Sequence, residues 1–198
     1  MKILIACEYS GIVRDEFLKL GHDAISCDIL PCESEYYTKS DRHYQGDVMD
    51  ILNNGWDMMI AHPPCTHLSV SGARWFTSGH KPMYLRDEAI EFVRTLMEAD
   101  IEKICIENPV SVISSYIRKS DQTINPYQFG HKEYKRTCLW LKNLPKLVET
   151  DNVKEETDKL PRNEKYRIWW LGSGKGKERS KFYTGIAKAM AEQWGKDN

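Results

Sequence analysis

The sequence predicts an α/β fold in which helices cover both faces of a mostly parallel, twisted sheet. Apolar runs of strand length alternate along the chain with segments in which apolar residues recur at helical spacing. This alternation is typical of parallel strands joined by right-handed crossovers. The length of 198 residues, with 41% hydrophobic and 29% charged residues, is that of an ordinary globular domain.

The N-terminal segment is expected to supply two strands and a helix. Residues 2–7 form an apolar run that ends in a polar loop, which predicts the first strand. Ser10 is a suitable N-cap for a helix over 12–20, and Gly21 follows that helix at its end. Residues 22–28 predict a second strand that ends on an acidic residue.

The next segment is expected to add two more strands. A polar loop over residues 29–43 leads to a third strand that ends before Asp47. A small helix is expected over 48–53, and the largely apolar run over 56–61 predicts the fourth strand. Pro63-Pro64 ends this strand, because proline cannot donate a backbone hydrogen bond.

The pattern is clear as far as residue 110 and weaker beyond it. A helix is expected over 84–99 and a strand over 101–106, which Asn108-Pro109 ends. Further on, the sequence predicts a short helix over 112–117, a strand over 137–141, a charged loop over 147–165 and an amphipathic helix over 182–194.

Composition excludes a membrane protein. No apolar run approaches the ~18 residues that a membrane span requires. The N-terminal apolar stretch runs into Glu8 without a small-residue cleavage site, unlike a signal peptide. We therefore expect a cytoplasmic protein that does not bind membranes.

The net charge of −1 predicts no general attraction to nucleic acid, but the charge is unevenly distributed. Acidic residues predominate over residues 1–60. Basic residues predominate over 161–181, where they are Arg162, Lys165, Arg167, Lys175, Lys177, Arg179 and Lys181. With Tyr166, Trp169 and Trp170 interleaved, this segment is compatible with phosphate and base contacts, and equally with a solvated basic face.

The six cysteines are scattered without C-x-x-C spacing, so neither a disulfide framework nor a metal site is expected. Cys65 differs from the others because it follows Pro63-Pro64, which fixes a rigid turn at the end of a strand. A thiol held in this way is a candidate nucleophile. The alternative is a structural turn with an inert thiol.

Ligands of parallel α/β sheets bind at the carboxyl ends of the strands. The polar residues that directly follow the apolar runs are therefore candidate site residues. They are Glu8–Gly11, Asp28, Asp47, His62–Cys65 and Glu107-Asn108.

Two of these segments carry a recognisable combination of motifs. Pro64-Cys65 is followed by Ser69, Gly72 and Arg74, and about forty residues later a strand ends in Glu107-Asn108. The sequence thus resembles the cytosine-C5 DNA methyltransferase family, whose motifs are a P-C-x-x-x-S-x-x-G-x-R loop and a strand-end Glu-Asn dipeptide. The resemblance implies a Rossmann-like methyltransferase domain that uses S-adenosylmethionine.

The resemblance also implies roles for the catalytic residues, which are Cys65, Glu107, Asn108 and Arg74. The thiolate of Cys65 would add to carbon 6 of cytosine, so that carbon 5 can attack the sulfonium methyl group. Glu107 would hold or protonate ring nitrogen 3 as the thiolate adds.

The loop over residues 7–11 lies where the family has a Phe-x-Gly-x-Gly loop. Gly11 matches a glycine of that loop, whereas Cys7 stands at the Phe position and Tyr9 replaces the other glycine. Asp28 matches the residue that binds the ribose hydroxyls, and Asp47 the one that contacts the adenine amine. The cofactor-binding residues implied by the resemblance are Glu8, Tyr9, Ser10, Gly11, Asp28, Asp47 and Pro63.

On the substrate side, the family has a Gln-x-Arg-x-Arg segment near the cytosine. Aligning the apolar run over 138–141 places Lys135 and Thr137 at the arginine positions and displaces Arg136. A strand with a basic rim explains the same residues. The substrate-binding residues implied are Pro64, Ser69, Lys135, Arg136, Lys175 and Lys177.

We interpret residues 1–198 as a single methyltransferase-like domain. Family members usually carry a separate target recognition domain, and here only the basic and aromatic loop region 142–181 is available in its place. We therefore expect a monomer with little sequence specificity of its own, or with specificity lent by a protein partner.

The first hypothesis is an S-adenosylmethionine-dependent DNA (cytosine-5)-methyltransferase. It would act on duplex DNA with a flipped base or on single-stranded DNA. Such a minimal enzyme would suit a phage acting in the cytoplasm of its host. Two alternatives stay open: modification of RNA or a free cytosine nucleotide, with S-adenosylmethionine or another one-carbon donor, and a catalytically inactive relative that binds nucleic acid.

Overall fold

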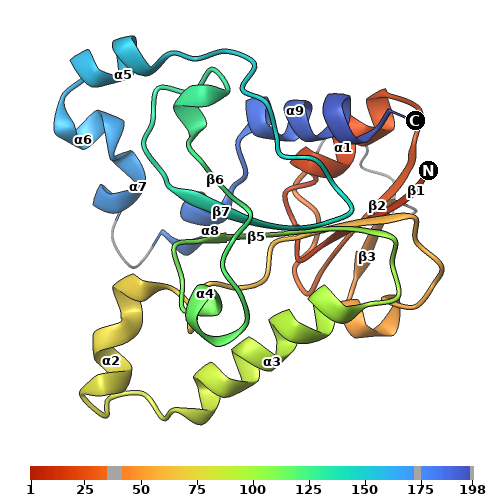
Figure 1. The fold of residues 1–198 in the computed structure, drawn as a ribbon, viewed down its shortest axis with the longest axis horizontal. Helices are drawn as coiled ribbons and strands as arrows, with labels where there is room; N and C mark the ends of the chain where they lie inside the picture. Colours follow the sequence, from red (N-terminus) through yellow and green to blue (C-terminus); the bar gives the residue numbers. More distant parts are fainter. Residues whose placement is uncertain (35–41, 172–174, 197–198) are drawn as a thin grey trace.

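The computed structural model describes residues 1–34, 42–171 and 175–196, and within them seven strands form one sheet (Figure 1). The strand order is β3-β2-β1-β4-β5-β7-β6. The strands are β1 Lys2–Ala6, β2 Asp23–Asp28, β3 His43–Gln45, β4 Met58–Ala61, β5 Lys103–Pro109, β6 Gln122–Ile124 and β7 Thr137–Lys142. Strands β1 to β5 pair in parallel, and β7 runs antiparallel to both β5 and β6. The mostly parallel α/β sheet is thus confirmed.

Helices cover both faces of this sheet, as predicted (Figure 1). Helices α1 (Ile12–Lys19) and α9 (Thr184–Trp194) pack on one face, and α3 (Tyr84–Glu98) packs on the other. Successive side chains of β1 point to opposite faces of the sheet, as in any β-strand. Ile3 lies in the cluster beneath α1 and α9, and Leu4 in the cluster beneath α3.

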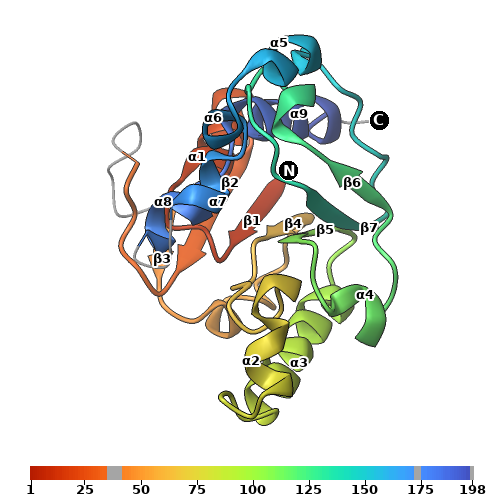
Figure 2. The same cartoon turned by 90° about the vertical axis from the view of Figure 1, so that its left-hand side faces the viewer.

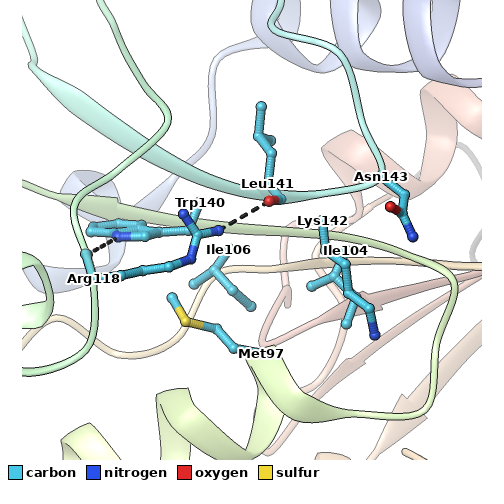
Figure 3. Close-up of a pocket in the computed structure, with 8 residues that line it drawn as sticks. All are labelled: Met97, Ile104, Ile106, Arg118, Trp140, Leu141, Lys142 and Asn143. Atoms are coloured by element: carbon cyan, nitrogen blue, oxygen red, sulfur yellow. Dashed lines mark hydrogen bonds between the residues drawn. The ribbon is translucent and has the colours of Figure 1, made fainter.

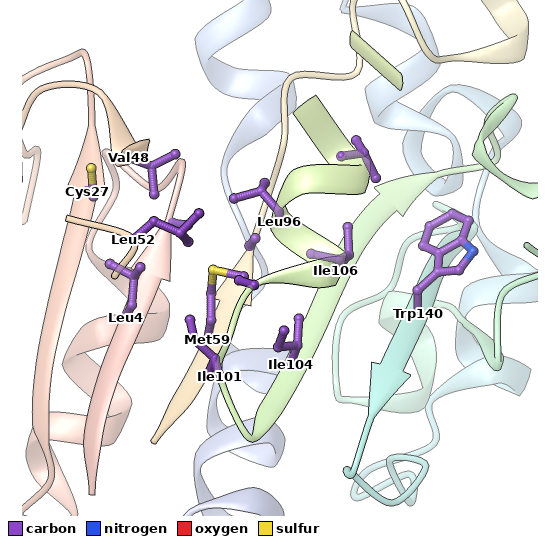
Figure 4. Packing of buried hydrophobic residues seen from close by; sticks show 14 of the residues in the cluster. Leu4, Cys27, Val48, Leu52, Met59, Leu96, Ile101, Ile104, Ile106 and Trp140 are labelled. Carbon is purple, nitrogen blue, oxygen red and sulfur yellow. The ribbon is translucent and has the colours of Figure 1, made fainter. Parts of the chain in front are cut away.

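The cluster beneath α3 extends across most of the sheet (Figure 4). Figure 4 shows Leu4 and Met59 on the central strands, Leu96 on α3, and Trp140 on β7. All four side chains are almost completely buried. Burying apolar surface of this kind supplies the main favourable free energy of folding.

The connections contain more helix than the sequence predicts. The sequence predicts short helices where η2 (Val48–Asp50) and α4 (Ile113–Tyr116) lie. The others are η3 (Val70–Gly72), α2 (Ala73–Thr77), η4 (Pro126–Gln128), α5 (Lys154–Lys159), α6 (Arg162–Lys165), α7 (Arg167–Trp170) and α8 (Gly176–Ser180). The prediction of a loop over 147–165 is wrong, because α5 and α6 lie within it. Only Thr157 of α5 is buried and α6 buries no residue, so neither helix has an apolar period that reveals it.

Two local predictions near the strand ends also need correction. The helix expected over 48–53 is only the short η2, and the side chain of Asp47 accepts a hydrogen bond from the Met49 N–H at its start. The N-cap of α1 is Gly11, and not Ser10. The carboxylate of Glu8 accepts hydrogen bonds from the N–H groups of Val13 and Arg14 in the first turn of this helix.

The strand order reverses between β1 and β4, which lie next to each other at the centre of the sheet. Ala6, Ala61 and Ile106 are in register across β1, β4 and β5, so the residues after them meet at one edge. Figure 2 shows α2 on one side of this edge, with α7 and α8 on the other. None of the helices in the described residues has the length and apolar character needed to cross a membrane.

Candidate active site

A buried carboxylate organises the loop after β1. Glu8 is 4% exposed, and its Oε1 accepts hydrogen bonds from the Val13 N–H at 2.7 Å and the Ser10 hydroxyl at 3.1 Å. Its Oε2 accepts a third, at 3.3 Å, from the N–H of Arg14. Burial raises the pKa of Glu8, while His62 and these hydrogen bonds act in the opposite direction. Glu8 therefore caps helix α1, and both of its carboxylate oxygens accept hydrogen bonds from within the protein.

The same loop contains a glycine that its geometry requires. Gly11 has a φ of 72°, and a Cβ atom added there would lie 2.6 Å from Arg14 Nη2 and 2.7 Å from Ser34 Cβ. Arg14 is fully buried and donates to Asp15 Oδ1 at 2.7 and 2.8 Å and to Ser26 Oγ at 3.1 Å. Sequence analysis missed this buried ion pair, because two neighbouring charges on a helix are usually solvated.

Tyr9 fills the space between this loop and α8. It is 7% exposed, and its hydroxyl donates a hydrogen bond of 2.6 Å to the backbone carbonyl of Lys177. The hydroxyl of Ser180 lies 3.0 Å from the same oxygen. Glu33 forms ion pairs with Lys177 at 2.9 Å and Lys181 at 3.3 Å. The basic C-terminal segment is thus fastened over the loop.

Asp28 and Asp47 flank the beginning of this loop from the side of β2 and β3. Asp28 Oδ1 accepts a hydrogen bond from the Leu30 N–H at 2.9 Å, and Asp47 caps η2. Burial raises the pKa of the Cys7 thiol well above its usual value, and the nearby Asp28, Cys27 and Asp47 raise it further. Burial and two nearby carboxylates therefore both favour the neutral thiol of Cys7.

The Pro-Cys turn is held against the end of β5. The Asn108 side chain, 1% exposed, donates a hydrogen bond of 2.8 Å to the carbonyl of Pro63. The carbonyl of Cys65 accepts from the Leu68 N–H at 3.1 Å and the Ser69 N–H at 2.9 Å. Ser69 in turn forms an isolated antiparallel bridge with Ser111, which follows β5. These bonds fix the backbone around the thiol.

Cys65 is partly buried and lies within electrostatic reach of Glu107. Burial raises the pKa of the Cys65 thiol, and the negative charge of Glu107 raises it further. Lys135 and Arg179 oppose this effect with positive charge. Glu107 and Lys135 thus lie close enough to Cys65 for their charges to act on its thiol, as does Arg179, which the sequence did not single out.

His62 lies beside Glu107. Its Nδ1 is 3.0 Å from Oε2 of Glu107, and its ring centroid lies 4.7 Å from that of Phe182. The opposite ring nitrogen, Nε2, is buried and has no hydrogen-bond partner among the described residues. His62 is among the polar residues that follow the apolar runs of the sequence, but no motif gave it a role.

Other predicted site residues are exposed or are bound to groups other than the thiol. Arg74 is exposed on α2, with its guanidinium 4.7 Å from the ring centroid of Trp75. Lys175 pairs with Glu178 at 3.1 Å, and Lys177 with Glu33 as described. Pro64 and Arg136 are exposed. Lys135 Nζ donates a hydrogen bond of 3.1 Å to the Arg179 carbonyl.

A basic and aromatic hollow of about 660 Å³ lies on α6 and α7. Its lining residues are Arg162, Lys165, Tyr166, Trp169 and Trp170. Tyr166 stacks on Tyr134 with ring centroids 5.3 Å apart, whereas Trp169 is 77% exposed. Gly172-Ser173-Gly174, which belong to the same predicted loop region, lie outside the described residues.

A second hollow, of about 400 Å³, lies between α3 and β7 (Figure 3). It is lined by Met97, Ile104, Ile106, Arg118, Trp140, Leu141, Lys142 and Asn143. The Arg118 carbonyl accepts a hydrogen bond from Trp140 Nε1 at 2.8 Å, and its guanidinium donates to the Leu141 carbonyl at 3.0 Å. This hollow contains none of the predicted site residues.

No protein-family model matches the sequence, and no curated protein matches it. Similar folds exist among solved structures. A DNA modification methyltransferase encoded within an E. coli prophage has a TM-score of 0.46 at 15% identity, covering 81% of this chain and 55% of that one. The Entamoeba histolytica methyltransferase EhMeth has a TM-score of 0.51 at 15% identity, covering 76% and 57%. The S. pombe Dnmt2 methyltransferase has a TM-score of 0.46 at 16% identity, covering 82% and 55%.

This chain thus spans little more than half the length of these solved proteins. At such identities the likeness to EhMeth concerns the fold alone. The described residues form a Rossmann-like α/β fold of the kind found in methyltransferases.

Proposed function

We propose that the chain is an S-adenosylmethionine-dependent DNA (cytosine-5)-methyltransferase that forms a covalent cysteine adduct. One observation carries the proposal: Cys65 follows β4, Glu107 lies near the carboxyl end of the adjacent strand β5, and the charge of Glu107 acts on the Cys65 thiol. The order and spacing of the P-C-x-x-x-S-x-x-G-x-R and Glu-Asn motifs support it, as does the methyltransferase fold.

The residues around the β1 loop suit S-adenosylmethionine. Gly11 forms a close turn that a Cβ atom would block, and Asp28 and Asp47 offer carboxylate oxygens to hydroxyl and amine donors. We assign the ribose hydroxyls to Asp28 and the adenine amine to Asp47, with the backbone of Glu8, Tyr9, Ser10 and Pro63 nearby. Bound there, S-adenosylmethionine would supply an electrophilic methyl group.

The chain's own residues would activate the cytosine ring. The Cys65 thiolate forms a bond to carbon 6, and the electron pair of the 5,6 double bond becomes available at carbon 5. Glu107 holds or protonates nitrogen 3, which stabilises the charge that enters the ring. Asn108 fixes the Pro63 carbonyl and so the position of the turn. Once carbon 5 is methylated and has lost its proton, elimination of the thiolate restores Cys65.

The DNA would bind between α2, which carries Arg74, and the segment with α7 and α8 (Figure 2). The target base must be flipped or already unpaired, because Cys65 cannot reach carbon 6 inside a base stack. We propose that region 142–181 stands in place of a target recognition domain. Its exposed tryptophans and basic residues would stack a base and hold the backbone.

The test is methyl transfer from labelled S-adenosylmethionine to duplex DNA, single-stranded DNA, RNA and dCMP. We expect labelled 5-methylcytosine in DNA with the wild-type protein and none with Cys65→Ala. Cys32→Ala is the matched control, because Cys32 is also a partly buried free thiol. Absence of label on every cytosine, together with absence of cofactor binding, would reject the enzyme and leave the nucleic-acid-binding relative.

The near-neutral net charge favours a second candidate, modification of a free cytosine nucleotide or of RNA. Salt dependence separates a small from a polymeric substrate. Affinity for a polymer falls steeply as the salt concentration rises, because binding releases condensed counterions, whereas affinity for one nucleotide changes little. Label found only in dCMP or RNA would establish the second candidate.

A further inference from the structure

A histidine that follows β4 lies beside a buried carboxylate. His62 Nδ1 is 3.0 Å from Glu107 Oε2. Its side chain is 13% exposed, and that of Glu107 is 10% exposed. The ring of Phe182 packs against the imidazole. His62 therefore has little freedom to turn.

This geometry selects one form of the imidazole. The ionised carboxylate of Glu107 can only accept hydrogen bonds, so in that state the short contact requires a proton on Nδ1. In the neutral ring Nε2 then has a lone pair, and this nitrogen has no hydrogen-bond partner among the described residues. The bond occupies Oε2 of Glu107 and restricts rotation of the carboxyl group about its Cγ–Cδ bond.

We propose that His62 is a positioning residue that orients Glu107 by binding Oε2, so that Oε1 is directed toward the target ring. This inference rests on the proposed function. A catalytic carboxyl group must be held close to its productive geometry, and a misplacement of about 1 Å can lower a rate by about a hundredfold. Asn108 fixes the Cys65 turn from the same strand end. His62 and Asn108 thus place the two reacting groups relative to each other.

Two amide substitutions separate this role from simple filling of space. The amide nitrogen of His62→Asn occupies the position of Nδ1, whereas that of His62→Gln occupies the position of Nε2. We expect His62→Asn to retain single-turnover methyl transfer within about threefold, and His62→Gln to lose about a hundredfold. Because the loss is in the chemical step, KM for DNA should change less than about twofold.

His67→Asn is the matched control. His67 lies two residues after Cys65 and is partly buried, with its ring edge-on to Phe76 at 6.0 Å. The His67→Asn variant should transfer methyl groups at the wild-type rate. Equal rates for His62→Gln, His62→Asn and the wild type would overturn the inference and leave the proposed function intact.

A second measurement does not depend on activity. Long-range proton–nitrogen correlation spectra of ¹⁵N-histidine protein, assigned with His62→Asn, report which ring nitrogen carries the proton. We expect a proton on Nδ1 of His62 in the wild type and loss of that preference in Glu107→Ala. A proton found on Nε2 alone in the wild type would overturn the inference. Failure of the wild type to methylate any substrate would instead reject the proposed function, whichever tautomer is found.

Discussion

The hydroxyl of Tyr9 donates a hydrogen bond of 2.6 Å to the carbonyl of Lys177, which lies 168 residues further along the chain. Tyr9 stands where the methyltransferases that the sequence resembles have a glycine. Its side chain therefore occupies space that would otherwise be open, and α8 closes over it. The loop proposed to hold the cofactor is thus joined to the basic C-terminal segment.

Removing this hydroxyl should loosen α8. We expect Tyr9→Phe to lower the free energy of unfolding by about 1 kcal/mol, the typical net contribution of one hydrogen bond. Urea denaturation measures the loss. The substitution should also increase the rate of amide exchange more in residues 175–181 than in α9. Tyr44→Phe is the control, because Tyr44 is exposed and bonds only to Asp50 of a neighbouring turn among its described contacts. An equal effect of both substitutions would contradict the assigned contact.

The turn at Gly11 should tolerate no side chain. Gly11→Ala places a residue in the left-handed region and its Cβ 2.6 Å from Arg14 Nη2. Gly55→Ala meets the same backbone restriction at φ 70° but has open space around its Cβ. We expect Gly55→Ala to destabilise the fold by about 1 kcal/mol and Gly11→Ala by clearly more, since contact with a buried ion pair adds to the strain. Thermal or chemical unfolding measures the loss of stability in both variants. Equal losses would show that a Cβ atom at position 11 is not crowded by Arg14.

The reactivity of Cys65 should depend on pH in a direction set by its neighbours. Because burial and Glu107 raise its pKa, alkylation should rise with pH and reach half its maximum above the value for an ordinary thiol. Glu107→Gln removes a negative charge and should shift this midpoint to lower pH. Lys135→Met removes a positive charge and should shift it to higher pH.

Peptide mass spectrometry after iodoacetamide treatment measures the Cys65 profile separately from the other five thiols. Lys188→Met is the control, since Lys188 is an exposed residue of α9. A midpoint that does not move in Glu107→Gln would show that the two groups do not interact.

The exposed tryptophans of α7 should contribute to nucleic-acid binding. Trp169 and Trp170 are 77% and 62% exposed, so replacing them should hardly change the free energy of unfolding. If they stack on bases, Trp169→Ala should weaken binding to single-stranded DNA by about 1–3 kcal/mol. Lys165→Ala should instead reduce the slope of log K against log salt by about 0.7, the contribution of one phosphate contact. Fluorescence anisotropy at several salt concentrations distinguishes the two, and unchanged affinity for Trp169→Ala would exclude stacking.

Local sequence patterns determined the α/β class and the main elements. The largely apolar stretches over 2–7, 56–61 and 101–106 each became a strand of the sheet. The last of these strands was expected to end before Asn108-Pro109, but β5 includes both residues. Because parallel strands present their carboxyl ends at one edge, the sequence also predicted that Cys65 and Glu107 would lie near each other. These properties follow from residues close together in the chain.

Tertiary structure decided what depends on residues far apart. Three features of the structure leave no periodic signal in the sequence. They are the antiparallel placement of β7 between β5 and β6, the burial of Arg14 with Asp15, and the hydrogen bond between Tyr9 and Lys177. The same is true of the contact between His62 and Glu107, which are 45 residues apart. Each of these pairings is selected by packing and desolvation across the whole sheet, and local propensity carries no information about which distant segment will meet it.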